Sequence, residues 1–260
     1  MTAEEPVLVR EQRGAVLVLR LNRPDARNSL TAELISEIGL GMEQAEDDPD
    51  IRCVVLTGTG DRAFCAGMDL RGFAAGAAVT DAGSRGTAAF ARFTQGGVRV
   101  PVVGAANATA VAGGFELLLG CDLVVASDAA SFGLPEVKRG LFAAGGGVFL
   151  TTRIPLAVAL ELTLTGDLID AARAQALGLI NQVVPAEQVL DAAVSLAERI
   201  AQNGPLGLEA TKQIGRTAVT DMAKAQQLFV EWQPKVFGSD DAKEGATAFI
   251  EKRPPVWTGH

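Results

Sequence analysis

Three short apolar runs, each followed by a glycine-rich or small-residue turn, constrain the fold of this chain more than any other feature. They cover residues 53–57, 100–105 and 123–126. Runs of this length and composition are typical of buried strands. A fourth run, residues 16–21, ends in the turn sequence Asn22-Arg23-Pro24-Asp25 and is also expected to form a strand.

Helical patterns alternate with these strands. Thr31 can cap a helix over residues 32–46, whose apolar stripe is expected to face the core rather than a ligand. Residues 156–164 and 171–177 have the same spacing, and residues 179–184 are expected to form the last strand. Strands that alternate with helices over this length predict an α/β fold with a buried sheet.

The 260 residues suit one α/β core with an appendage. We expect the core over residues 1–200. The remainder, residues 201–260, follows the helix-breaking sequence Asn203-Gly204-Pro205 and has helical patterns with charged faces and no strand signals. This second region is therefore predicted to be helical.

Composition excludes several classes of protein. A net charge of −8 and a pI near 4.8 argue against binding to nucleic acid or an anionic membrane by charge alone. The acidic N-terminus does not resemble a secretory signal, and the most apolar run, residues 117–126, is interrupted by Asp122 and too short for a membrane span. A cytoplasmic location is expected. The odd count of cysteines, Cys53, Cys65 and Cys121, fits a reducing compartment, and we expect all three in the core.

Histidine is nearly absent, which limits the chemistry available. The only histidine is the terminal His260, and the chain has no tyrosine. Catalysis by Ser–His–Asp or Cys–His arrangements and metal binding by histidine are therefore not expected. Proton transfer has to come from carboxylates, lysine, cysteine or water.

Two small-residue turns about fifty residues apart, residues 63–70 and 112–117, each lead into the start of a helix. Two such turns can direct two backbone N–H groups at one oxygen atom, which is the design of an oxyanion hole. Glu116 lies one helical turn inside the second of them. The alternative interpretation of both turns is ordinary tight packing.

Two glycine patterns have partial similarity to nucleotide-binding motifs. Residues 58–63 fit a loose G-x-G-x-x-A dinucleotide pattern, but residues 66–69 interrupt the helix that a true fingerprint would open. The run Gly145-Gly146-Gly147 lacks the Lys-Ser/Thr of a phosphate loop. Close packing or a tight turn is the expected role of these three glycines.

Four blocks of the sequence resemble the crotonase, or enoyl-CoA hydratase/isomerase, superfamily. In order they are Leu21-Asn22-Arg23-Pro24, residues 63–70, residues 112–117 and Phe132-Gly133-Leu134-Pro135-Glu136. The resemblance implies an α/β fold built as a crotonase-like spiral of repeated ββα units, followed by a C-terminal helical trimerisation region. It also implies an acyl-CoA thioester substrate, no separate cofactor or metal, and assembly as a homotrimer or a dimer of trimers.

The same resemblance assigns roles to four residues. The backbone N–H groups of Met68 and Gly113 would form the oxyanion hole. Glu116 would orient and deprotonate a water for attack at C3, and Glu136 would deliver a proton to C2. The alternative is a helix-surface role for Glu116 and a turn role for Glu136.

Binding residues follow from the resemblance less directly. Arg71 matches a basic residue near the CoA adenine, and Arg27 and Lys252 are candidates for the phosphates, with a solvated surface role as the alternative for each. Asp69 is expected to hold its own loop by hydrogen bonds. By analogy, residues 73–98 line the acyl pocket, although their conformation cannot be predicted from the sequence.

An enoyl-CoA hydratase is the first functional hypothesis. The sequence departs from the hydratase pattern at one position that bears on this hypothesis. Ala144 replaces a glycine that hydratases commonly have before their second glycine cluster. Double-bond isomerisation and thioester hydrolysis are therefore kept as alternative reactions. A non-catalytic acyl-CoA binding protein is the third hypothesis.

Overall fold

The computed structural model describes residues 5–78, 80–81 and 83–260. A six-stranded sheet forms its centre, in the order β1-β2-β3-β4-β6-β9. All neighbouring strands are parallel except the β1–β2 pair, which is antiparallel. The strands are β1 (Leu8–Arg13), β2 (Val16–Leu21), β3 (Cys53–Gly58), β4 (Val102–Ala106), β6 (Leu123–Ser127) and β9 (Gln182–Val184).

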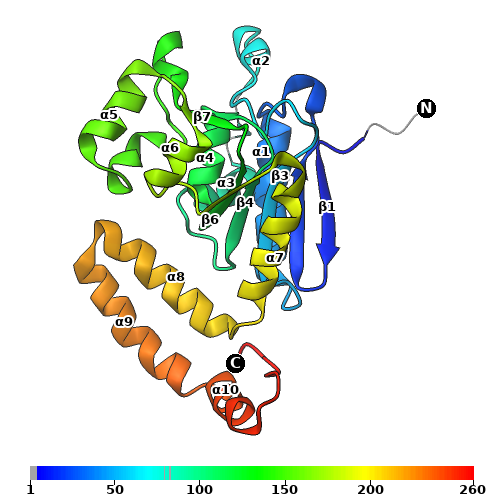
Figure 1. Ribbon diagram of the computed structural model, residues 1–260, viewed down its shortest axis with the longest axis vertical. Helices are drawn as coiled ribbons and strands as arrows, with labels where there is room; N and C mark the ends of the chain where they lie inside the picture. Colours follow the sequence, from blue (N-terminus) through cyan, green and yellow to red (C-terminus); the bar gives the residue numbers. More distant parts are fainter. Residues whose placement is uncertain (1–4, 79, 82) are drawn as a thin grey trace.

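Helices cover both faces of this sheet. Alternate side chains of β2 point to opposite faces, so that Leu17 and Leu19 join one buried cluster and Val16 and Val18 join the other. Helix α1 (Ala32–Asp47) packs on the first face, with α3 (Arg85–Thr94) against it. Helix α7 (Val189–Ala201) covers the second face (Figure 1). Both faces of a largely parallel sheet are therefore buried, as its apolar strands require.

A small second sheet lies beside the first. Its strands are ordered β5-β7-β8, with β5 and β7 parallel and β7 and β8 antiparallel. They are β5 (Ala110–Val111), β7 (Ser131–Gly133) and β8 (Ile169–Asp170). Helix α4 (Gly113–Gly120) follows β5 directly and is almost entirely buried. The turn into α4 is thus fixed by strand pairing.

Seven further helices lie between β2 and α7 in the described part of the chain. They are η1 (Pro24–Ala26), α2 (Leu70–Ala74), η2 (Pro135–Arg139), η3 (Gly147–Thr152), α5 (Leu156–Thr165), α6 (Ala171–Ala176) and η4 (Ala186–Gln188).

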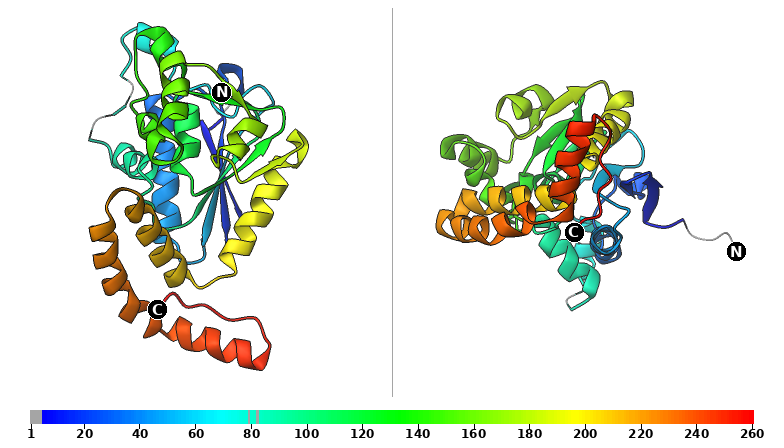
Figure 2. Two further views of the ribbon diagram at one scale, coloured as in Figure 1. Left: turned by 60° about the vertical axis from the view of Figure 1, so that its left-hand side comes forward. Right: turned by 90° about the horizontal axis from the view of Figure 1, so that it is seen from below.

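Three helices form the C-terminal region and extend away from the sheet (Figures 1 and 2). They are α8 (Pro205–Thr220), α9 (Met222–Phe237) and α10 (Asp240–Glu251). The tail after α10 returns to the core, where the Trp257 indole N–H donates to the Gln202 carbonyl at 2.7 Å. Arg52, next to β3, donates to the carbonyl of Trp257 at 3.3 Å.

Most of the predicted elements are confirmed. The Thr31 hydroxyl accepts the Leu34 N–H at 3.2 Å and caps α1 as expected. The predicted last strand is too long, because only residues 182–184 pair with β6. Strand β1 and helices α3 and α7 were not predicted. The division into residues 1–200 and 201–260 stays a prediction, although α7 ends at Ala201 and α8 begins at Pro205.

The cysteines are buried and free, as expected. Burial raises the pKa of each thiol to about 12, so all three remain protonated at neutral pH. None of them is poised to act as a nucleophile. Among the described residues, no helix is both long enough and apolar enough to cross a bilayer.

Candidate active site

The amino-terminal end of α4 is held in an unusual backbone conformation. Ala112, the residue before the helix, has φ 52° and ψ −132°, which is strained for any residue with a Cβ atom. Its N–H donates to the Gly133 carbonyl at 2.9 Å, and the preceding Val111 N–H donates to the Cys65 carbonyl at 3.1 Å. These bonds fix the direction of the next N–H group, which belongs to Gly113.

A second backbone segment lies against this turn. The Leu30 N–H donates to the Gly67 carbonyl at 2.8 Å, and the Asp69 N–H donates to the Leu30 carbonyl at 2.9 Å. Gly67 has φ 83°, and a Cβ atom added there would lie 3.1 Å from the Gly113 nitrogen. The glycine is therefore needed for the two segments to approach.

The N–H groups of Met68 and Gly113 lie close together as a result. A Cβ atom built on Gly113 would be 3.8 Å from the Met68 nitrogen. Neither N–H donates a hydrogen bond to another of the described residues. Two free, neighbouring backbone donors at the start of a helix form a site for an oxygen that carries negative charge.

Glu116 projects from α4 one turn after Gly113 and is only 7% exposed. Its Oε1 atom accepts the Gly147 N–H at 2.8 Å. Gly145 also lies against the carboxylate, since a Cβ atom there would be 2.6 Å from Oε2. Burial raises the pKa of Glu116, while the N–H groups of Gly147 and Gly145 act in the opposite direction.

Glu136 lies on η2, which begins with Pro135, and is partly buried. Its Oε2 atom has no hydrogen-bond partner among the described residues. Burial is the largest influence on the pKa of Glu136 and raises it, and the nearby charge of Glu116 raises it further. Its own backbone N–H and Arg139 oppose this rise.

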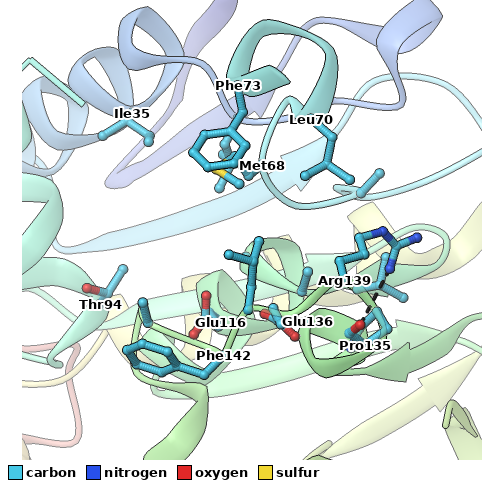
Figure 3. Close-up of a pocket in the computed structure, with 18 of the residues that line it drawn as sticks. Ile35, Met68, Leu70, Phe73, Thr94, Glu116, Pro135, Glu136, Arg139 and Phe142 are labelled. Atoms are coloured by element: carbon cyan, nitrogen blue, oxygen red, sulfur yellow. Dashed lines mark hydrogen bonds between the residues drawn. The ribbon is translucent and has the colours of Figure 1, made fainter. Parts of the chain in front are cut away.

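Both carboxyl groups point into one cavity of about 490 Å³ (Figure 3). The cavity lies between α2, α3, α4, η2 and the segment before Gly145, and Met68 and Gly113 also line it. Most of the other lining residues are apolar. They include Leu30, Ile35, Leu70, Phe73, Phe90, Leu141 and Phe142. Two carboxyl groups in such a dry setting can differ in protonation near neutral pH, so that one acts as a base and the other as an acid.

The structure thus brings together the four residues assigned to catalysis: Met68, Gly113, Glu116 and Glu136. Residues of the segment 73–98 line the cavity too, as the resemblance implied. Ala144 lines it as well, and its side chain is exposed.

The structure also confirms the expected role of Asp69. Its Oδ1 atom accepts the Gly72 N–H at 3.2 Å and caps α2, and its Oδ2 atom pairs with Arg23 at 3.2 Å. The Gly72 N–H is the main reason that the pKa of Asp69 lies below its ordinary value. Asp69 therefore stabilises the loop next to the oxyanion donors.

The three basic candidates do not line the cavity. Arg27 is exposed, and its carbonyl accepts the Ala66 N–H at 3.0 Å, which places it beside the oxyanion segment. Arg71 is exposed on α2. Lys252 directly follows α10, which lies at the opposite end of the long axis from α2 (Figure 1). A single chain does not bring Lys252 to the site.

Several features of the site were not predicted. Ile35 was expected to be only a core residue, but it is buried and also lines the cavity, because α1 packs beside it. Arg139 lines the cavity as well. Its spacing of three residues from Glu136 would have indicated this, since such residues share a face of a 3₁₀ helix. The close packing predicted for the glycine run is confirmed at Gly145 and Gly147.

Comparison with known proteins identifies the family of this chain. Residues 11–260 match the family model described as enoyl-CoA hydratase/isomerase. Enoyl-CoA hydratase EchA19 of Mycobacterium tuberculosis is 41% identical over 94% of both chains. Carnitinyl-CoA dehydratase of Proteus mirabilis is 39% identical over 95% of this chain and 96% of the relative.

Solved structures are similar over nearly the whole chain. A crystal structure of an enoyl-CoA hydratase from Mycobacterium tuberculosis has a TM-score of 0.88 and 42% identity, covering 98% of this chain and 100% of the other. A carnitinyl-CoA hydratase from Mycobacterium avium has a TM-score of 0.77 at 42% identity, with the same coverage. The chain therefore belongs to the enoyl-CoA hydratase/isomerase family, the crotonase superfamily, and has its fold.

Proposed function

We propose that this protein is an enoyl-CoA hydratase that adds water across the C2–C3 double bond of a trans-2-enoyl-CoA thioester. One observation carries the proposal: the carboxyl groups of Glu116 and Glu136 face a single cavity beside the two free N–H groups of Met68 and Gly113. The similarity to enoyl-CoA hydratase EchA19 supports the same reaction class.

The two backbone donors stabilise negative charge on the substrate. In our proposal the thioester carbonyl oxygen accepts hydrogen bonds from Met68 and Gly113. When water attacks C3, the electrons of the double bond move toward this oxygen and form an enolate. A preorganised donor of this kind contributes roughly 2.7–4 kcal/mol to the transition state. The strained Ala112 keeps the Gly113 donor in place before substrate binds.

The two glutamates divide the proton transfers. Ionised Glu116 takes a proton from the attacking water, whose oxygen bonds to C3. Protonated Glu136 gives its proton to C2 as the enolate collapses to the thioester. The proton left on Glu116 returns to Glu136 through water, which restores both groups for the next turnover. Such acid–base catalysis contributes about 10²–10⁴ in rate.

The surroundings of the glutamates suit this division. Glu116 accepts the Gly147 N–H, which favours its ionised form. Glu136 has a buried oxygen without a partner, which favours its protonated form. The carboxylate of Glu116 adds to this preference, because its negative charge disfavours ionisation of Glu136.

The same residues can catalyse the reverse reaction, the dehydration of a 3-hydroxyacyl-CoA. The carnitinyl-CoA dehydratase relatives favour this second candidate. Isomerisation or thioester hydrolysis in the same site would be recognised by an isobaric product or by free CoA.

Acyl-CoA binding is proposed to involve Arg27 and Arg71, because the Arg27 carbonyl accepts the N–H of the cavity-lining residue Ala66 and Arg71 follows the cavity-lining residue Leu70 on α2. Lys252 could contact CoA only from a neighbouring chain. The C-terminal helices expose large apolar side chains that fit a homotrimer or a dimer of trimers: Phe229, Val230, Phe237, Phe249 and Ile250. Light scattering is expected to give the mass of a trimer or a hexamer, and a monomer at micromolar concentration would contradict this.

The reaction as written needs no metal or separate cofactor. Among the described residues, no cluster of three or more histidine, cysteine, aspartate or glutamate residues could hold a metal ion. We expect the hydration rate to stay unchanged after dialysis against EDTA. A rate that EDTA abolishes and an added divalent cation restores would overturn this part of the proposal.

The test is hydration of crotonyl-CoA and longer enoyl-CoA thioesters, followed by loss of the conjugated-enoyl absorbance and by product mass. The wild-type product is expected to gain the mass of one water. Glu116→Gln and Glu136→Gln should each lower kcat by about 10² or more. Absence of turnover with every enoyl thioester, or full activity in both variants, would refute the proposal.

A further inference from the structure

The carboxyl-terminal end of α4 is bound by two arginine side chains. Arg216 donates from Nη2 to the carbonyls of Gly120 at 3.1 Å and Cys121 at 2.8 Å. Arg153, at the end of η3, donates to the carbonyl of Leu119. Carbonyl groups at the end of a helix have no partner within the helix, and they carry the negative end of its dipole. Two cationic side chains therefore supply hydrogen bonds to the carbonyl groups at this end of α4.

Asp122, just after α4, extends the network. Its Oδ1 atom accepts Arg216 Nε at 2.8 Å, and its Oδ2 atom accepts Lys212 Nζ at 2.7 Å and the Val102 N–H at 2.8 Å. Lys212 also donates to the Val100 carbonyl at 2.8 Å. The Lys212 side chain is only 10% exposed, so this is a largely buried network in which Lys212 and Arg216 share the carboxylate of Asp122.

Lys212 and Arg216 both belong to α8, the first helix of the C-terminal region, and lie one turn apart. Gly96, just after α3, lies against the Arg216 guanidinium so closely that a Cβ atom there would clash with it. The network thus joins α8 to the ends of α3 and α4 and to the start of β4. Through Arg216, the C-terminal region contacts the helix of the active site directly.

The opposite end of α4 carries the reaction. Gly113 is its first residue, and Glu116 follows one turn later. A helix of 8 residues is about 12 Å long and behaves as one rigid element, so a change in tilt at one end moves the other. Misplacement of reacting groups by about 1 Å can cost on the order of 10² in rate.

We propose that Arg216 and Lys212 are positioning residues for the hydration reaction, which hold α4 by its carboxyl-terminal end so that the Gly113 N–H and the Glu116 carboxylate stay in register with the substrate. The proposal rests on the proposed function. It assigns to the C-terminal helical region a direct part in the geometry of the oxyanion hole.

The test compares Arg216→Met, Arg216→Lys and the control Arg199→Met. Arg199 is an exposed arginine of α7 that makes no ion pair with the described residues. Two quantities are measured for each protein: kcat and KM for hydration, and the absorption of bound p-dimethylaminocinnamoyl-CoA. The absorption of this thioester moves to longer wavelength when its carbonyl oxygen accepts strong hydrogen bonds, so it reports on the oxyanion hole without turnover.

Arg216→Met is expected to lower kcat by about 10- to 100-fold with a smaller change in KM, and to reduce the wavelength shift. Arg216→Lys keeps a positive charge beside Asp122 but lacks the guanidinium that bonds two carbonyls at once. It should therefore recover part of the kcat and part of the wavelength shift. Arg199→Met should match the wild type.

A folded Arg216→Met with wild-type kcat and wild-type wavelength shift would overturn the proposal. If Arg216→Met does not fold, Arg216→Lys and Lys212→Met take its place, and wild-type values in both would overturn it equally. If the wild type hydrates no enoyl-CoA, the proposed function fails. In that case the wavelength shift still tests whether Arg216 positions the Gly113 N–H toward a bound thioester carbonyl.

Discussion

The polar groups at the two ends of α4 differ in whether they have hydrogen-bond partners. At the amino-terminal end, the N–H groups of Met68 and Gly113 and one oxygen of Glu136 have no partner among the described residues. At the carboxyl-terminal end, the last carbonyls and the Asp122 carboxylate are bound by side chains and backbone. Groups left free at one end are available to a substrate, and groups bound at the other end stabilise the fold.

One helix can therefore contribute both to catalysis and to the stability of the fold. Burying Glu116 and straining Ala112 cost stability, which is common at functional sites. At the far end, removing one member of the charged network leaves a largely buried charge without its partner, which also costs stability. Substitutions at the two ends should therefore separate activity from stability.

Glu116→Gln is expected to have the largest effect on activity, a loss of about 10²–10⁴ in kcat. Its stability should not fall. Because burial raises the pKa of Glu116 in the folded protein, the stability associated with its protonated form is present at low pH and is lost as the pH rises through that pKa. A neutral glutamine avoids this loss, and its Oε1 can still accept the Gly147 N–H.

Thermal unfolding at two pH values checks this. At pH 8 the Tm of Glu116→Gln should equal or exceed that of the wild type, and any advantage should shrink near pH 4. A variant that is much less stable at pH 8 would show that Glu116 is a structural residue.

Asp122→Asn should give the opposite result at the other end. The substitution leaves Lys212 and Arg216 without their anionic partner in a largely buried network, which costs about 3 kcal/mol of unfolding free energy. Denaturant unfolding measures this. A loss below about 0.5 kcal/mol, the range for ordinary surface substitutions, would mean that the network does not stabilise the fold.

Gly145→Ala tests the contact that fixes the Glu116 carboxylate. A Cβ atom 2.6 Å from Oε2 must displace the carboxylate, so kcat should fall by about 10². Gly207→Ala in α8 is the matched control, because its Cβ atom would meet no atom within 4 Å. Equal activity in the two variants would argue against a precise position for Glu116.

The pH dependence of kcat gives the smallest and most diagnostic effect. Activity should fall at low pH as Glu116 takes up a proton and at high pH as Glu136 loses one. Both limbs of the pH profile should lie at higher pH than for ordinary glutamates, because both pKa values are raised. The residual activity of Glu136→Gln should lack the alkaline limb. An unchanged alkaline limb in that variant would assign it to another group.

The sequence predicts the amino-terminal end of α4 well because its signals are local. Small residues around Gly67 and Gly113, followed by Glu116 at one helical turn, specify the turn and the helix start together. The role of Glu136 was implied only by the resemblance to the crotonase superfamily. The structure places Glu136 in the same cavity as Glu116.

The carboxyl-terminal end could not be predicted in the same way. Asp122 and Arg216 are 94 residues apart, and no local pattern relates them. Ile35 was expected only in the core, since periodicity shows which face of a helix is apolar but not what that face meets. The strain at Ala112 was also hidden, because an alanine with positive φ gives no signal in composition or spacing.

Hydration of an enoyl-CoA in D₂O is the decisive test of whether Glu116 and Glu136 add water across the double bond. We predict that the wild-type product contains one added water and one non-exchanging deuterium at C2, and that Glu116→Gln and Glu136→Gln each lower the rate by about 10² or more. A wild-type protein that forms no such product with any enoyl-CoA, or one whose rate survives both substitutions, would contradict the account.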